Sequence, residues 1–266
     1  MTSFGKRGEG PEEMSSADCF RFISTDSIWT LDANRMRTTR WKIEQNMHKI
    51  TSVETVDMDK RLVRALDFYP MESGFLVTDY LGEYRQKWTD QQGKWINSTN
   101  EIPTRKYNEK ISRPILAQAW RSFIDYNPQK KILAMATQLG EVLEIYNFKD
   151  SVQFIIYGPH GEPEFQSTPS DAIPIGIMGF SDIQITDNYI YTVFHGKTFK
   201  EIEQALKQGK KTEDGGYYIY VFDLAGNLVR KYILDHAIYG IYVNEDTGTI
   251  LATDVNNDEP ILQFKI

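Results

Sequence analysis

Three oxygen-bearing residues near the carboxyl end of the chain, Asp254, Asn256 and Asp258, have the spacing of the first ligands in a calcium-binding loop. Carboxylate and amide oxygens are the ligands that Ca²⁺ prefers in proteins. The sixth position of such a loop is normally glycine, whereas Glu259 occupies it here. A turn between two strands is rich in the same residue types. The pattern gives candidate calcium ligands, and calcium is the one cofactor that we consider.

A second set of candidates lies where apolar segments end and loops gather. His195 ends such a segment and precedes Gly196, a position that suits either a cleft-facing imidazole or a structural one. With Asp182, Asp254 and Asn256 it would supply ligands to a metal-dependent hydrolase or lactonase. The four histidines show no zinc-site spacing, and no Gly-x-Ser-x-Gly motif offers a serine nucleophile. We therefore favour a non-catalytic binding or scaffold protein, with the metal-dependent enzyme as the alternative.

Aromatic residues in polar surroundings form a third candidate site. Trp88, Trp95 and Tyr107 lie in or near residues 88–114, a stretch with few apolar residues that predicts a long loop. Such aromatics build platforms for a carbohydrate or a protein partner. They also close loops onto a sheet as small satellite clusters. Both interpretations suit the pattern.

Composition narrows the classes of partner. The formal charge of −7 argues against nucleic acid, since phosphate binding needs clustered lysine and arginine. The single cysteine, Cys19, allows no intramolecular disulfide and suits a small buried apolar position. The sequence has no run of about 20 apolar residues that would span a bilayer, and no leader pattern at its start.

Repeats indicate how these candidates are positioned. A short apolar segment, a polar turn and a second apolar segment recur five times, at a period of roughly 40 to 60 residues, which is typical of β-propeller blades. We predict an all-β protein with a single propeller domain over residues 1–266 and about five visible blades. The clearest copies of the repeat begin at Cys19, Ala65, Ser122, Ser181 and Ile238.

One insertion departs from the strand pattern. Thr198 and Glu201 have the spacing of a capping box, and Gly209 suits the end of a helix, so residues 198–209 predict a short helix inside the fourth blade. We expect this helix to cover the propeller edge through an apolar face. That face consists of Phe199, Ile202 and Leu206.

A glycine-rich segment near the start carries a resemblance to a known family. Gly5, Gly8, Gly10, Pro11 and Glu13 match the Gly-x-x-Gly-x-Gly-Pro-x-Glu loop of the TolB-like six-bladed β-propellers of bacteria, which are relatives of the NHL-repeat propellers. The loop lacks the Gly-Lys-Ser/Thr ending of a phosphate-binding loop, so we expect its glycines to serve a tight crossing between blades.

The resemblance extends over nearly the whole chain. Residues 179–197 (GFSDIQITDNYIYTVFHGK), 218–234 (YIYVFDLAGNLVRKYIL) and 240–266 are similar to later blades of the family. The resemblance implies a six-bladed fold and an exported protein, periplasmic or anchored at the cell surface as a lipoprotein. It implies no reaction. Relatives place a whole blade before the glycine loop, so we expect the first blade and a signal segment to be missing or incomplete here. Closure with five blades would require residues 2–4 to pair outside residues 261–266.

Overall fold

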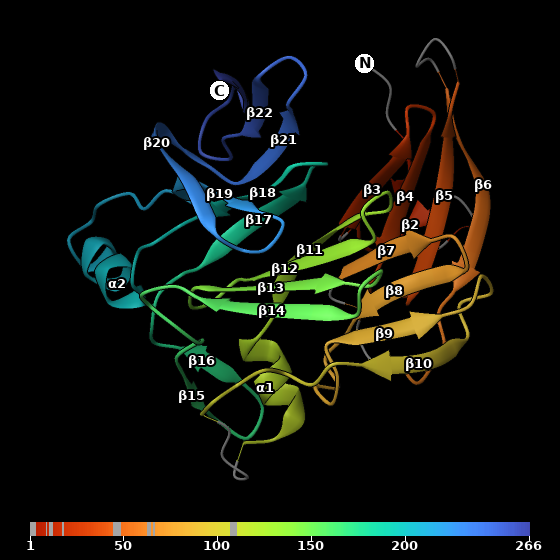
Figure 1. Ribbon diagram of the computed structural model, residues 1–266, viewed down its shortest axis with the longest axis horizontal. Coiled ribbons are helices and arrows are strands. Elements are labelled where there is room, and N and C mark those ends of the chain that lie inside the picture. The colour runs from red at the N-terminus through yellow and green to blue at the C-terminus, as the bar shows by residue number, and fades with distance from the viewer. Residues whose placement is uncertain are drawn as a thin grey trace. The chain divides into compact units, whose positions relative to one another are not determined.

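The computed structural model describes residues 4–8, 10, 13–17, 19–44, 49–62, 65, 67–106 and 111–266. The chain divides into two compact units, Met1–Ile102 and Pro103–Ile266, which we describe in turn. In both, antiparallel sheets of three or four strands dominate (Figure 1). Five of these sheets correspond to the repeats, so the prediction of an all-β chain with about five propeller blades is confirmed. The single domain over residues 1–266 stays a prediction.

The first unit contains two four-stranded sheets (red to yellow in Figure 1). One consists of β3 (Cys19–Ser24), β4 (Ser27–Asp32), β5 (Arg37–Ile43) and β6 (Ile50–Asp57). The other consists of β7 (Asp67–Met71), β8 (Gly74–Thr78), β9 (Gln86–Thr89) and β10 (Trp95–Thr99). The expectation of a long loop over residues 88–114 was therefore wrong in part, because β10 pairs with β9, whereas residues 100–106 form no helix or strand. The polar residues of β10 suit a strand, because the side chains of β10 are partly exposed.

Apolar packing joins these two sheets. Trp29 of β4 meets Phe75 of β8 edge-on, with 5.1 Å between the ring centroids. Cys19 is half-buried and packs against the same cluster. A polar contact reinforces the seam, since the Arg21 guanidinium donates to the Phe68 carbonyl at 3.0 Å and pairs with the Asp67 carboxylate at 2.6 Å.

The glycine-rich segment forms a compact turn ahead of β3. Its short strands β1 (Lys6–Arg7) and β2 (Glu13–Met14) pair in parallel. The Gly8 amide donates to the Met14 carbonyl, and the Gly10 amide to the Glu13 carboxylate at 2.7 Å. These two amides are engaged by the turn itself. Phe4 packs on Trp41, with ring centroids 5.2 Å apart. Pro11 and Thr2, which the sequence analysis used, lie outside the described residues.

The second unit contains three further blades (green to blue in Figure 1). The first consists of β11 (Ser122–Asn127), β12 (Ile132–Thr137), β13 (Val142–Asn147) and β14 (Val152–Tyr157), and helix α1 (Arg113–Ala119) precedes it. The next consists of β17 (Phe180–Ile185), β18 (Tyr189–Phe194), β19 (Gly216–Asp223) and β20 (Leu228–Ile238). The last has only β21 (Gly240–Asn244), β22 (Thr249–Thr253) and β23 (Ile261–Lys265), and a small pair, β15 (Phe165–Ser167) and β16 (Ala172–Pro174), lies apart.

Burial on both faces explains why β18 and β19 are almost continuously apolar. Along β19, Tyr220 and Phe222 face the cluster shared with β12 and β13, whereas Ile219 and Val221 face the cluster shared with β21 and β22. Successive strand residues point to opposite faces, so a strand between two neighbouring blades needs apolar residues at every position.

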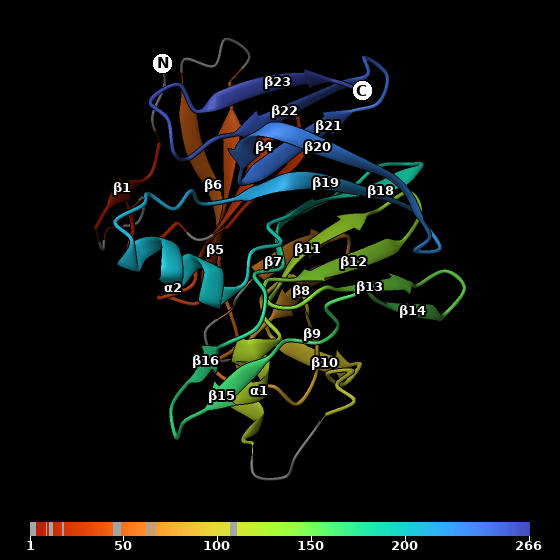
Figure 2. The same cartoon turned by 90° about the vertical axis from the view of Figure 1, so that its left-hand side faces the viewer.

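Helix α2 (Phe199–Lys207) occupies the predicted insertion between β18 and β19, outside the four-stranded sheet (Figure 2). The capping box is confirmed, because the Thr198 side chain accepts from the Glu201 amide and the Glu201 carboxylate accepts from Thr198. The predicted apolar contact was wrong in part: Phe199 and Ile202 are half-buried, but Leu206 is 58% exposed. The first turns of the helix are therefore packed against neighbouring residues, whereas Leu206 in its last turn is not. Neither helix in the described ranges is long and apolar enough to cross a membrane.

We expect Thr198→Ala to accelerate amide hydrogen exchange in α2 about fivefold, because losing such a cap costs about 1 kcal/mol. Exchange at Glu201 and Ile202, followed by mass spectrometry or NMR, measures the effect. Lys200→Ala alters the same turn outside the capping box and should leave these rates unchanged. Equal acceleration in both variants would contradict a role for the box.

Candidate functional site

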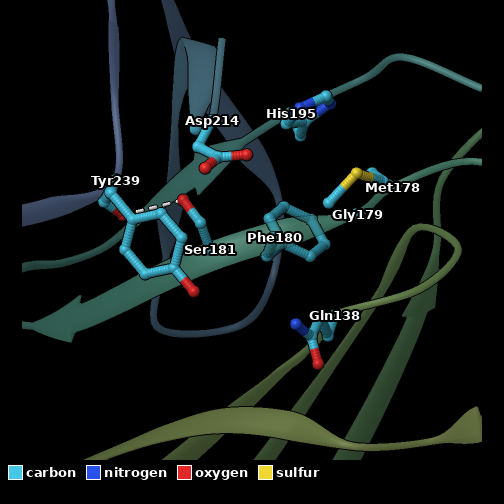
Figure 3. A pocket seen from close by; sticks show the side chains of 9 residues that line it. Gln138, Met178, Gly179, Phe180, Ser181, His195, Asp214 and Tyr239 are labelled. Atoms are coloured by element: carbon cyan, nitrogen blue, oxygen red, sulfur yellow. Dashed lines mark hydrogen bonds between the residues drawn. The ribbon is translucent and has the colours of Figure 1, made fainter. Parts of the chain in front are cut away.

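A small pocket of about 40 Å³ lies in the second unit, enough for a few water molecules or one small polar group. It forms where the segment after β12, the start of β17, the end of β18 and the start of β19 meet (Figure 3). Its lining consists of Gln138, Met178, Gly179, Phe180, Ser181, His195, Asp214, Gly215 and Tyr239.

Glycines allow these segments to approach each other closely. A Cβ atom on Gly179 would lie 2.2 Å from the Gly140 carbonyl oxygen. Gly215 has a φ of +100°, and a Cβ there would lie 2.3 Å from the Ile238 carbonyl oxygen. Only glycine fits both positions, because the neighbouring atoms belong to the backbone and have little freedom to move.

His195, a predicted site residue, lies in this pocket and is 5% exposed. Its Nδ1 accepts from the Lys197 amide at 3.3 Å, and the backbone of Glu213 also acts on the ring. Burial, together with the Lys197 charge, lowers the pKa of His195, although Asp214 and the Glu213 contact act in the opposite direction. Burial thus favours the neutral ring, whose Nδ1 is engaged by the Lys197 amide.

The pocket contains a serine, a histidine and an aspartate, yet they do not form a hydrolytic triad. The Ser181 hydroxyl donates to the Tyr239 carbonyl at 2.7 Å rather than to His195 (Figure 3). The Nδ1 atom of His195 accepts from the Lys197 amide. A nucleophile needs a base within hydrogen-bond reach, and this arrangement supplies none to Ser181.

Asp214 carries the charge of the pocket. Within the part of the chain that the structure describes, its carboxylate has no ion pair and no side-chain hydrogen bond, and the residue is exposed. The Tyr239 ring lies on the same side of Phe180 as Asp214, whereas Gln138 lies across the Phe180 ring (Figure 3). The neighbouring Glu213 is engaged, because Tyr217 donates to its carboxylate, which raises the pKa of Tyr217 to about 12. The pocket therefore combines an apolar floor with one available carboxylate.

One of the predicted calcium ligands, Asn256, holds the Asp214 loop. The side-chain amide of Asn256 accepts from the Asp214 amide and donates to the Asp214 carbonyl, each at 2.9 Å. Asp254 is buried and accepts from the Asn256 amide at 2.9 Å, which lowers the pKa of its carboxyl group. Asp258 is exposed. Across the described ranges, no three His, Cys, Asp or Glu side chains group as metal ligands. Calcium binding by these residues stays a prediction.

Asp182 joins two neighbouring blades and does not line the pocket. Its carboxylate accepts from the Ile241 amide of β21 at 2.7 Å and from the Ile183 amide at 2.9 Å. Asp125 makes the same kind of contact one blade earlier, with the Ile185 amide at 2.8 Å. The carboxylate satisfies a backbone N–H group at a seam where no ladder partner is available.

The two tryptophans lie in the first unit and point to opposite faces of one sheet, since Trp88 pairs with Asn97 whereas Trp95 pairs with Thr89. Both are half-buried. The Trp95 ring is covered by the Arg61 guanidinium at 4.5 Å, and the Trp88 indole donates to Thr99 at 3.0 Å. They do not form one shared platform. Tyr107 lies outside the described residues.

Sequence reasoning found His195 but missed Gln138, Ser181, Asp214 and Tyr239. These four come from segments far apart in the chain. The paired glycines Gly215 and Gly216, directly after Asp214, were the one local signal, because such a pair marks a close approach of backbones.

Comparison with known proteins gives a family and a fold. The family model described as TolB-like 6-blade propeller-like matches residues 1–246. No curated protein matches the sequence. Similar solved structures include a DUF4221 family member from Bacteroides vulgatus, at 7% identity and a TM-score of 0.54, over 97% of this chain and 81% of that one. A chain of the mitotic checkpoint complex matches at 10% identity and a TM-score of 0.50, over 90% of this chain and 58% of that one. These identities show likeness of fold alone.

We expect Asp182→Ala to lower the free energy of unfolding by about 1–3 kcal/mol, because the Ile241 N–H group loses its acceptor. Asp182→Asn keeps an oxygen acceptor and should cost less. Urea unfolding of both variants measures the difference. An alanine variant as stable as the wild type would show that the carboxylate is not needed at the seam.

We expect the protein to lose stability as the pH falls through about 6.5, the pKa of histidine in the unfolded chain. The pKa of His195 is lowered in the folded protein, so the unfolded state takes up a proton first and gains in relative stability. His195→Gln should therefore show a shallower decline, measured by urea unfolding between about pH 7.5 and 5.5. The control is His236→Gln, whose side chain is 47% exposed. If His195→Gln declines as steeply as the wild type, His195 is not the group responsible.

Proposed function

The chain belongs to the TolB-like 6-blade propeller-like family, and we propose that it is a non-catalytic binding propeller whose pocket takes a basic side chain of a protein partner. The observation that carries this proposal is the Asp214 carboxylate, which faces the pocket without an ion pair or side-chain hydrogen bond among the described residues. An available carboxylate beside an apolar floor suits a group that is both cationic and aliphatic.

A lysine side chain has the matching chemistry. Its ammonium group would donate to Asp214, while its methylene stem would pack on Phe180 and Met178. The pocket volume of about 40 Å³ suits the end of one side chain rather than a whole small molecule. The remaining contact area would come from the surrounding rim, as a partner protein provides.

The charge of the whole chain supports a basic partner. A formal net charge of −7 attracts a positively charged protein over the distance of a Debye length and speeds the encounter. We therefore expect binding to weaken as ionic strength rises.

The test uses an array of peptides that contain lysine or arginine, each paired with a copy in which glutamine replaces the basic residues. The wild-type protein should bind the basic members, and Asp214→Asn should weaken that binding at least about tenfold, because it removes the charge from an otherwise equal shape. Asp246→Asn removes the same charge from an exposed carboxylate in the same unit and should leave binding unchanged.

Two outcomes would overturn the proposal. Equal binding by the wild type and Asp214→Asn would show that the pocket carboxylate is not the contact. Turnover of ester or lactone substrates that is lost after chelation would favour the metal-dependent hydrolase instead, and metal analysis of the purified protein would then be expected to find calcium or another metal.

A further inference from the structure

The last blade is one strand narrower than the other four. The sheet β21–β22–β23 has three strands, whereas each of the other blades has four. Among the described residues β23 pairs with β22 alone, so its other side is an open edge. Ile261 is 65% exposed, and Gln263 and Lys265 are exposed as well. An open edge presents backbone groups to any strand that can pair with it.

The hydrogen bonds to β22 show which backbone groups face this edge. Asp254 donates to the Pro260 carbonyl at 2.7 Å, and Ile266 donates to the Gly248 carbonyl at 3.0 Å. In an antiparallel pair, hydrogen-bonded positions alternate along the strand. Residues of even number in β23 therefore bond to β22. The N–H and C=O groups of Ile261, Gln263 and Lys265 point away from it.

We propose that two copies of this chain associate by pairing their β23 strands antiparallel about Gln263. The three outward-facing residues are placed symmetrically around that centre. Gln263 of one copy would exchange two hydrogen bonds with Gln263 of the other. Ile261 would exchange two with Lys265 of the second copy at each end. The result is one continuous six-stranded sheet, in which each β23 takes the fourth-strand position of the other blade.

The side chains of β23 suit this self-pairing on both faces. Leu262 and Phe264 pack partly against the apolar cluster of the unit, and in the proposed register each would lie opposite the other residue type of the second copy. Aromatic and aliphatic side chains in such cross-strand positions stabilise antiparallel pairs. On the other face Lys265 would meet Ile261 rather than a second lysine, so no like charges oppose each other.

The register gives the proposal a charge test at Ile261, whose exposure tolerates substitution. Ile261→Lys would place lysine opposite Lys265 at both ends of the paired strands, whereas Ile261→Glu would place a carboxylate there. By sedimentation equilibrium we expect the wild-type protein to pass from 30.8 kDa towards twice that mass as concentration rises. Ile261→Lys should raise the dissociation constant at least about tenfold, and Ile261→Glu should not raise it.

A second pair of variants tests the backbone. Gln263→Pro removes an outward-facing N–H group from each copy without removing a bond to β22, so it should abolish the dimer. Gln263→Thr keeps the N–H group and should dimerise as the wild type does. A wild-type protein that stays monomeric at all concentrations would overturn the proposal. Equal dissociation constants for Ile261→Lys and Ile261→Glu would also overturn it, because any dimer contact would then lie elsewhere.

Discussion

Hydrogen bonds from side chains to the backbone at the seams between blades are the constraint on which the second unit depends. Among the residues that the structure describes, no strand of one blade pairs with a strand of the next, so the first strand of each blade has backbone groups without a strand partner. Buried amides without an acceptor are costly, and side chains of the preceding blade supply the acceptors. Asp125 and Asp182 do this for Ile185 and Ile241 at almost equal separations of 60 and 59 residues. Gln184 binds both the amide and the carbonyl of Val243 in the same way.

The seams also determine where the pocket forms. Backbones that cross at a seam come so close together that Gly179 and Gly215 are required there. The side chains of the crossing segments line the space that remains beside these glycines. Asn256 then holds the Asp214 loop through its backbone. Residues whose types suggest metal binding or catalysis thus act here by positioning a carboxylate. Among the described residues, the Ser181 hydroxyl binds a backbone carbonyl and has no base within hydrogen-bond reach.

Local patterns predicted the parts of the fold that depend on neighbours along the chain. The capping box at Thr198 and Glu201 begins α2 where expected, because both partners lie within one turn. Strands such as β14 and β18 followed from runs of apolar and aromatic residues between polar turns. The strand β10 was missed because its polar, partly exposed side chains resemble a loop. The exposure of Leu206 was missed for a related reason, since an apolar stripe shows which face is apolar but not how far the neighbouring surface extends.

The sequence by itself determined the repeat, the all-β blades, the helix insertion and the membership of a propeller family, because each depends on periodicity or local motif. Tertiary structure alone decided the role of each polar residue. Asp182 and Asn256 had the residue types of ligands, and their contacts became visible only once segments 59 and 42 residues apart were side by side. A carboxylate has the same chemistry in either role. Whether it binds a ligand or a backbone amide depends on which donor the fold brings within about 3 Å.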